Sequence, residues 1–148
     1  MVKPYERKIN YYETDKMGIV HHSNFVRYME ETRLYYMEKQ GIPYESIEKQ
    51  GLLIPVIGIE VKYKKAIHFG DTIVIQQWIK KMSSIKFSVF YEMRDKETGI
   101  LYATAHSEHC FVDENLKPVR FKKEYPDLYE NFALAALEDK AELEKNRE

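Results

Sequence analysis

Four segments of alternating apolar and polar residues constrain the fold of this chain most. They cover residues 57–63, 73–79, 85–93 and 102–112, and short turn-forming stretches at 68–71 and 95–99 lie between them. A period of two is typical of a β-strand that buries one face. We therefore expect four long antiparallel strands that form a meander linked by tight turns, after a short strand within residues 4–10.

The segment before these strands has the period of a helix. Its apolar stripe has the spacing i, i+3, i+4, i+7 and i+11 and consists of Phe25, Tyr28, Met29, Thr32 and Tyr36. Ser23 or Asn24 is the expected N-cap, and Gly41 with Pro43 ends the helix. A shorter helix is expected over residues 44–50.

An early helix followed by a run of strands predicts an α+β fold in which the helix buries its stripe on one face of the sheet. The second face and the sheet edges then need another cover, which favours association with a second subunit. We expect one domain over residues 1–148, in which residues 126–148 are a charged C-terminal helical extension.

Charge and composition exclude several classes of protein. The formal net charge of −1 argues against nucleic acid as the main partner. The single cysteine, Cys110, cannot form an intramolecular disulfide, so a reducing, cytoplasmic location is expected. A run of 18 apolar residues is absent from the sequence, so we expect no membrane span.

The loop that leads into the helix carries the main candidate for chemistry. Asp15 stands eight residues before Ser23. If the loop returns to the helix start, a carboxylate and several free main-chain N–H groups share a small space. Such N–H groups stabilise an oxyanion, and the carboxylate can act as nucleophile or general base. The alternative interpretation is that Asp15 only caps a turn.

Other polar residues invite sites that the spacing does not support. His21 and His22 are adjacent, and in an extended segment their side chains point in opposite directions, so we expect no metal site. Glu30 and Glu31 are each within a helical turn of an arginine, Arg33 and Arg27 respectively, so ion pairing at the surface is expected. Either glutamate is an alternative catalytic carboxylate.

Lysines gather near strand ends, at positions 62, 64, 65, 80, 81 and 86. A solvated surface is one interpretation, and a patch that binds a nucleotide phosphate is the other.

Residues 12–25, YETDKMGIVHHSNF, with Tyr28, Met29, Glu30 and Arg33, resemble the signature of the 4-hydroxybenzoyl-CoA thioesterase family of hotdog-fold enzymes. Residues 64–73, KKAIHFGDTI, resemble the second landmark of that family, where strands meet at a Gly-Asp turn. The order of elements is similar through about residue 125. Met17 and His21 depart from the family pattern, so the resemblance does not identify which acyl group this protein binds.

The resemblance implies a hotdog fold, in which a curved antiparallel sheet wraps a long central helix. It also implies a homo-oligomer, either a dimer or a tetramer built as a dimer of dimers, with active sites at the subunit interface. Carried over by position, Asp15 is the catalytic carboxylate, and the N–H of His22 polarises the thioester carbonyl. Gly18 permits the tight loop. Tyr12, Val20 and Phe25 are then the residues expected at the acyl group. From the lysine patch, Lys64 and Lys65 are the residues expected at a nucleotide phosphate.

The function implied is hydrolysis of a fatty or aromatic acyl-CoA to the free acid and CoA, with no metal and no cofactor. Asp15 is either the nucleophile or the general base. Two alternatives stay open: the acyl group is carried by acyl carrier protein instead of CoA, or the domain binds acyl-CoA without turning it over.

Overall fold

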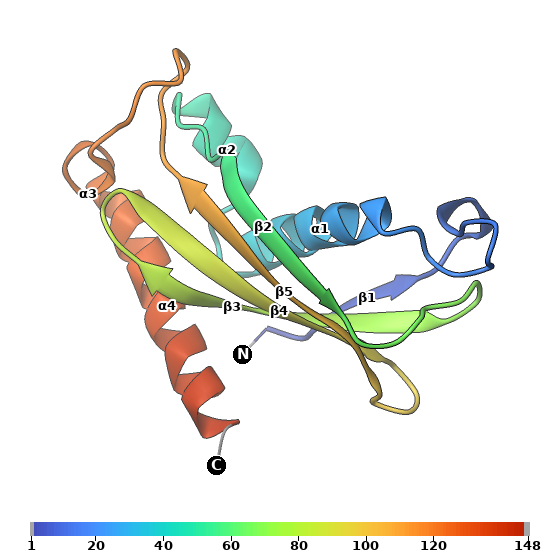
Figure 1. Ribbon diagram of the computed structural model, residues 1–148. Coiled ribbons are helices and arrows are strands. Elements are labelled where there is room, and N and C mark those ends of the chain that lie inside the picture. Colours follow the sequence, from blue (N-terminus) through green and yellow to red (C-terminus); the bar gives the residue numbers. More distant parts are fainter. Residues whose placement is uncertain (1, 147–148) are drawn as a thin grey trace.

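Alternation and turn residues produce one antiparallel sheet whose strand order is β1–β3–β4–β5–β2 (Figure 1). The computed structural model describes residues 2–146. The strands are β1 (Tyr5–Lys8), β2 (Val56–Tyr63), β3 (Thr72–Met82), β4 (Lys86–Asp95) and β5 (Leu101–Cys110). All five strands therefore lie within or close to the predicted segments.

The predicted meander is confirmed for β3, β4 and β5 and is wrong for β2. Neighbours in the chain pair from β3 to β5, but β2 pairs with β5 and not with β3. The chain therefore crosses the end of the sheet between β2 and β3. Strand β2 is therefore an edge strand. The local sequence pattern does not predict this, because β2 buries the same alternating residues whether it pairs with β3 or with β5.

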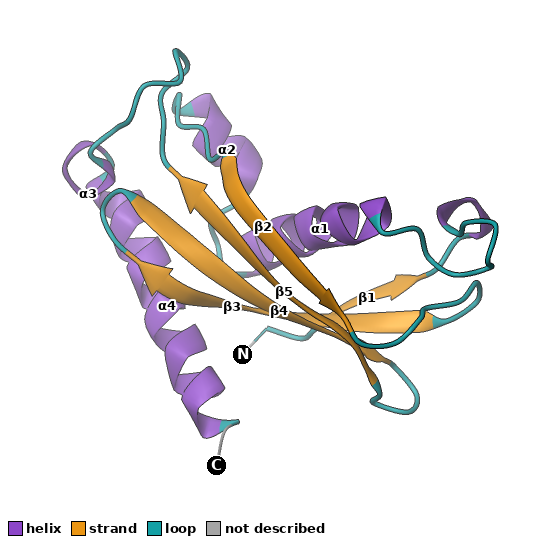
Figure 2. Cartoon of the chain, in the orientation of Figure 1, coloured by secondary structure: helices purple, strands orange, loops and turns teal. Residues whose placement is uncertain are grey.

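The long helix α1 (Ser23–Lys39) lies against the concave face of the sheet, as Figures 1 and 2 show. All five residues of the predicted stripe are buried. Phe25, Tyr28 and Met29 of this stripe share one apolar core with inward residues of the central strands, which include Ile75, Val89, Tyr91 and Ala105. Each large apolar side chain removed from water here stabilises the fold by about 1.5–3 kcal/mol. The small residues Ala103 and Ala105 face the same core.

A 3-10 helix, η1 (Tyr11–Glu13), follows β1, and three further α-helices complete the described chain. They are α2 (Tyr44–Lys49), α3 (Phe121–Glu124) and α4 (Pro126–Lys145). Helix α4 packs on β3 beyond Ile75, the last residue of β3 that pairs with β1, so it covers a stretch that β1 leaves without a neighbour. The predicted helix over residues 126–148 is confirmed through Lys145, and residues 147–148 lie outside the described part.

A carboxylate of α4 accepts a main-chain hydrogen bond from β3 next to an irregularity in that strand. The register between β3 and β4 shifts between Ile79 and Lys81, and the N–H of Ile79 donates to Oδ2 of Asp139 at 2.9 Å. Asp139 is 6% exposed. Burial raises the pKa of this carboxyl group to about 6. Within residues 2–146, no helix is long and apolar enough to cross a membrane.

Candidate active site

The loop before α1 folds back on itself as a small hairpin. Thr14 and Val20 form an antiparallel bridge, and the N–H of Asp15 donates to the carbonyl oxygen of Ile19 at 2.8 Å. Gly18 closes the turn with φ = +78°, a left-handed conformation that a side chain disfavours. This backbone conformation is the geometric reason for a glycine in the tight loop.

Asp15 stands at the start of this turn. Its Oδ1 accepts the N–H of Met17 at 2.8 Å, which is the turn-capping contact that the sequence allowed. Oδ2 takes part in no hydrogen bond among the residues that the structure describes. Capping and chemistry are therefore compatible, because one oxygen fixes the carboxylate and the other stays available.

The start of α1 presents a free main-chain donor. The N-cap is His22, so the predicted N-cap, Ser23 or Asn24, is wrong. The Ser23 hydroxyl instead bonds Nδ1 of His21 at 2.8 Å, and the Asn24 side chain donates to the carbonyl oxygen of Glu13 at 2.8 Å. Across residues 2–146, no hydrogen bond uses the N–H of His22. This N–H lies at the positive end of the helix dipole, where an anion is favoured.

The two histidine rings lie side by side, which contradicts the expectation that they point in opposite directions. Their centroids are 4.1 Å apart. The reason is the backbone of His22, which has φ = −55° and ψ = −30° and is helical instead of extended. In the described chain, no group of three His, Cys, Asp or Glu side chains is placed to hold a metal ion.

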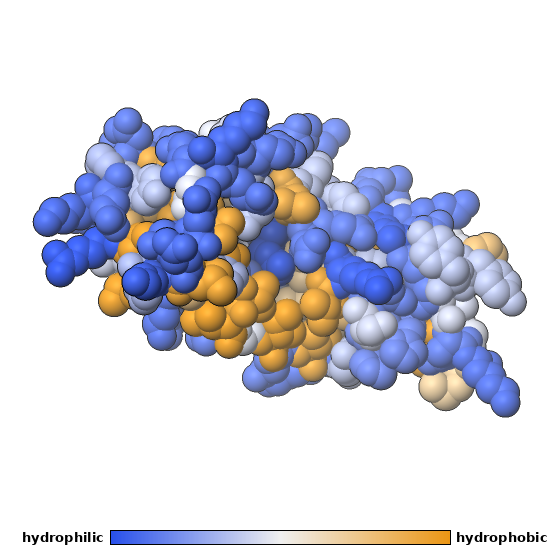
Figure 3. All heavy atoms as spheres, turned by 90° about the horizontal axis from the view of Figure 1, so that it is seen from above, coloured by the Kyte–Doolittle hydropathy of each residue, from blue (hydrophilic) through white to orange (hydrophobic). Residues whose placement is uncertain are grey.

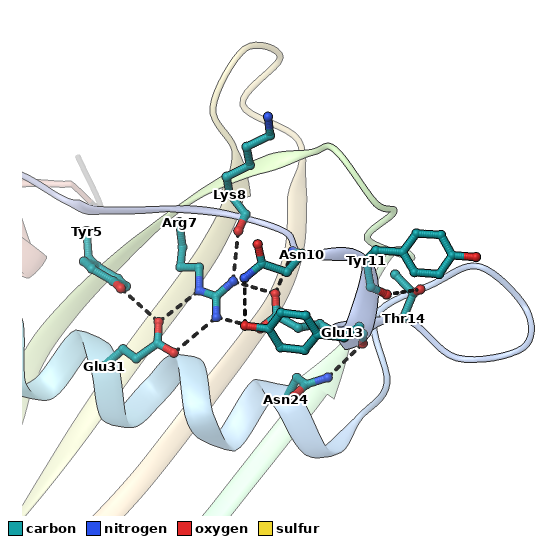
Figure 4. Close-up of polar contacts among 10 residues, drawn as sticks. Tyr5, Arg7, Lys8, Asn10, Tyr11, Glu13, Thr14, Asn24 and Glu31 are labelled. Carbon is teal, nitrogen blue, oxygen red and sulfur yellow. Dashed lines mark hydrogen bonds and ion pairs between the residues drawn. The ribbon is translucent and has the colours of Figure 1, made fainter.

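An arginine from β1 clamps this loop to the helix (Figure 4). The two terminal nitrogens of Arg7 bond the two carboxylate oxygens of Glu13 at 2.5 and 2.6 Å. Its Nε donates to Oε1 of Glu31 at 3.0 Å, and Tyr5 donates to the same oxygen at 2.9 Å. Glu13 is only 3% exposed, so its charge depends on Arg7 for compensation.

The main chain of Glu13 connects the residues bound by Arg7 to the start of α1. Its carbonyl oxygen accepts the N–H of His21 at 2.9 Å as well as the side chain of Asn24. The N–H of Asn10 donates to Oε1 of Glu13 at 2.7 Å. Glu13 is thereby fixed from both sides, and the hairpin that carries Asp15 is held beside the first turn of α1.

Sequence reasoning missed the clamp. Arg7 lies in the short first strand, where no sequence motif marks it, and the expected partner of Glu31 is Arg27. The structure contradicts the expected pairs: Glu31 binds Arg7, and Arg33 donates to the hydroxyl of Tyr91 at 3.0 Å. The available signal was Glu13 itself, an acid three residues after the capping residue Asn10.

The predicted acyl-contacting residues lie in different environments. The Tyr12 side chain is 79% exposed, and its hydroxyl accepts a hydrogen bond from Asn10 at 3.1 Å. Val20 and Phe25 are 5% and 4% exposed and belong to the core. Their contact with an acyl group stays a prediction.

The loop that follows β2 lies beside the hairpin. Val20 donates its N–H to the carbonyl oxygen of Ile67 at 2.8 Å, and Ile19 forms a bridge with His68. Lys64 and Lys65 begin this loop, both exposed, and both donate their N–H groups to the carbonyl oxygen of Tyr102. The structure thus brings the second sequence landmark beside the first.

Exposed apolar side chains surround this region. Tyr11, Met17 and Phe69 are 76%, 76% and 57% exposed, and the rings of Tyr11 and Phe69 are 5.5 Å apart. Figure 4 shows that the Tyr11 ring lies on the far side of the loop from the Arg7 clamp. Such side chains gain stability when a ligand or a second protein surface covers them.

Comparison with known proteins gives the family of the chain. Residues 9–133 match the family model described as the thioesterase-like superfamily. A Bacillus subtilis (strain 168) protein, YneP, named as a candidate acyl-CoA thioesterase, is 39% identical over 123 residues, which cover 82% of this chain and 88% of that protein.

Solved structures agree with this match. A DHNA-CoA thioesterase from Staphylococcus aureus superposes with a TM-score of 0.84 and 33% identity over 88% of each chain. A 1,4-dihydroxy-2-naphthoyl-CoA thioesterase from Synechocystis shares the fold, with a TM-score of 0.76 and 20% identity over 85% of this chain and 93% of that chain. The chain is therefore a hotdog-fold thioester hydrolase that belongs to the thioesterase-like superfamily.

Proposed function

We propose that this protein hydrolyses an aromatic or fatty acyl-CoA, with Asp15 and the N–H of His22 as its catalytic groups. The observation that carries this assignment is the free N–H at the start of α1, held by the Glu13 contacts beside the hairpin of Asp15. A main-chain donor of this kind is worth about 2.7–4 kcal/mol when it binds a developing oxyanion.

The chemistry requires little more than these two groups. The thioester carbonyl carbon accepts an oxygen, either from water that Asp15 deprotonates or from Asp15 itself. The carbonyl oxygen becomes an oxyanion that the N–H of His22 binds. The carbon–sulfur bond then breaks, and the sulfur leaves as a thiolate, which takes up a proton. If Asp15 is the nucleophile, the acyl group remains on its carboxylate as an anhydride, and water then hydrolyses this anhydride to release the acid and restore Asp15. A thiol with a pKa of about 8.5 leaves without a strong general acid.

Lys64 and Lys65 are the proposed contacts for the phosphates of CoA. Both are exposed and follow the edge strand on the loop that touches the hairpin. Tyr12, Val20 and Phe25 are the proposed acyl contacts, and Gly18 allows the turn.

A second copy of the chain is proposed to complete the site. Val56, Ile57 and Ile59 on the edge strand β2 are 44%, 51% and 40% exposed. Figure 3 shows apolar side chains gathered in a band across one face of the molecule. An apolar edge strand is a surface for strand pairing, so a dimer or a tetramer is expected.

The test measures thiol release from a panel of aryl- and alkyl-CoA thioesters by the wild type and by Asp15→Asn. Removal of a general base lowers the rate by about 10²–10⁴. Asp113→Asn is the matched control, because Asp113 also caps a turn through its side chain. If no thioester is hydrolysed, or if Asp15→Asn is as fast as Asp113→Asn, the proposal is wrong.

The same panel of thioesters distinguishes CoA from acyl carrier protein as the carrier of the acyl group. It also tests whether the protein binds acyl-CoA without hydrolysing it. Each acyl group is also presented on acyl carrier protein, whose binding depends more steeply on salt because it spans a larger charged surface. Faster hydrolysis from the carrier protein would reassign the substrate. Tight binding of acyl-CoA without hydrolysis would identify a binding module.

A further inference from the structure

A groove of about 820 Å³ lies between helix α4 and the ends of strands β3 and β4 that the β3–β4 turn joins. Figure 1 shows α4 beside β3. Residues between 80 and 88 form one wall, residues between 129 and 140 of α4 form the other, and Glu108 of β5 completes the lining. The groove therefore shares no residue with the hairpin of Asp15 or with the start of α1.

The α4 wall of the groove is apolar over most of its length. Tyr129, Ala133, Ala136 and Leu137 line it at the helical spacing i, i+4, i+7 and i+8. Both alanines are half-buried, while Leu137 is 64% exposed. From Tyr129 to Lys140 this wall is about 16 Å long, which is about three turns at 1.5 Å per residue. A surface of this length with small residues in it admits a second helix at close range.

Lysines surround this apolar wall. The groove is lined by four of them, all exposed, namely Lys80, Lys81, Lys86 and Lys140, against one acid, Glu108. Among residues 2–146, none of the four forms an ion pair. Four ammonium groups at one groove create a positive potential, and the carboxylates of a partner would neutralise it.

Strand β3 is closed to strand pairing at this place. Beyond Ile75, where the pairing with β1 ends, α4 packs on β3, and the N–H of Ile79 donates to Asp139. A bound segment must therefore contact side chains, which favours a helix over an added strand. A flat lipid surface would meet the lysines but not the half-buried alanines, Ala133 and Ala136.

We propose that this groove docks an amphipathic helix of a partner protein, with an apolar face bordered by carboxylates. The apolar face packs on Ala133, Ala136 and Leu137, and the carboxylates pair with the lysines. This goes beyond the proposed thioester hydrolysis, because docking uses neither Asp15 nor the N–H of His22. The groove is lined by β3, β4, β5 and α4 and not by β2, so a docked helix leaves the edge of β2 free for a second copy.

The test measures binding of a fluorescein-labelled synthetic helix to the full-length protein by fluorescence anisotropy. The peptide has about 20 residues, because shorter isolated helices are marginal in water. Leucine and alanine form one face, and glutamate borders it; a second peptide has lysine in place of every glutamate. We expect saturable binding of the glutamate peptide, at least tenfold tighter than that of the lysine peptide. Binding is expected to weaken as salt is added, because salt screens exposed charges.

A pair of double variants locates the charges that matter. Lys81→Glu with Lys140→Glu is expected to weaken binding of the glutamate peptide at least tenfold, because it reverses two charges of the groove. Lys49→Glu with Lys117→Glu is the matched control, since it makes the same change of formal charge at exposed positions outside the groove. We expect this control to bind the peptide as the wild type does.

A pair of leucine variants separates docking from general attraction between charges. Leu137→Ala removes an apolar contact at the groove and is expected to weaken binding about threefold or more. Leu134→Ala is the control, because Leu134 is also exposed on α4, at 53%, but does not line the groove. Equal binding by these two variants would show that only charge holds the peptide, and the docking proposal would then be wrong.

Further outcomes overturn the proposal: no saturable binding of the glutamate peptide, equal binding of the two peptides, or equal binding by the two double variants. The comparison of the peptides uses the wild type, so it decides the matter even if a variant does not fold. Binding to phosphatidylglycerol vesicles that the glutamate peptide does not compete away would assign the lysines to a lipid surface. A lower mass of Lys81→Glu with Lys140→Glu by light scattering would place a second copy in the groove instead.

Discussion

At the scale of single residues, Asp139 makes folding depend on pH. Its pKa is about 6 in the folded protein, mainly because of burial, and about 3.9 in an unfolded chain. Between these values the folded state keeps a proton that the unfolded state releases. Stability from this group is therefore fully present below about pH 4 and is lost as pH rises to about 6.

Urea unfolding of the wild type and of Asp139→Asn at several values between pH 4 and pH 7 measures this effect. The stability of the wild type relative to Asp139→Asn is expected to fall across this range by up to about 3 kcal/mol. His109 stays neutral when folded and is common to both proteins, so its opposite pH dependence cancels in the comparison. A difference that stays constant with pH would contradict the burial argument.

At the scale of elements, the Arg7 clamp joins β1, the hairpin and α1. Arg7→Met leaves the Glu13 carboxylate, 3% exposed, without a counter-ion, and the loss of one partner of a buried ion pair costs about 3–5 kcal/mol. The double variant Arg7→Met with Glu13→Met removes both charges and is expected to be more stable than Arg7→Met alone.

Chemical unfolding of Arg7→Met, of Glu13→Met and of the double variant measures this coupling. Arg27→Met is the control, since Arg27 is exposed on α1 and forms no ion pair in the described residues. We expect it to change stability by less than about 0.5 kcal/mol. Equal losses for Arg7→Met and Arg27→Met would show that the clamp does not hold the loop.

The sequence predicted elements better than their partners. The period of α1 and the alternation of β3 to β5 identified the core, since each pattern reports which side of an element is buried. The neighbour of β2 and the partner of Glu31 depend on segments far away in the chain. Glu31 lies one turn from Arg27, yet its Oε1 accepts from Arg7 of β1 and from Tyr5, and Arg7 is part-buried.

The same limit applies to the candidate site. The loop motif pointed to Asp15 and to the start of α1, but the cap at His22 and the close approach of the two histidine rings follow from one helical backbone conformation. The Asn24 side chain holds the loop by donating to the main-chain carbonyl oxygen of Glu13. A sequence pattern does not predict which carbonyl oxygen a side chain binds.

At the scale of the whole molecule, the free edge of β2 predicts self-association. Light scattering of the wild type is expected to give two or four times the chain mass of 17.7 kDa. Ile59→Lys places a charge on this edge and is expected to shift the protein toward 17.7 kDa, because a charge on an edge strand opposes pairing. Leu137→Lys, at an exposed position on α4, is the control and keeps the wild-type mass. A wild type of 17.7 kDa would contradict a site completed by a second copy.

The central claim is that the main-chain N–H of His22, and not its imidazole, acts on the thioester. His22→Pro removes only this donor among the main-chain groups, and φ = −55° suits proline at the start of a helix. The most direct measurement is kcat/KM for thioester hydrolysis by His22→Pro and His22→Ala, which both lack the imidazole. We predict that His22→Ala stays close to the wild type and that His22→Pro is slower by about 10²–10³. Equal rates for the two variants would contradict the account.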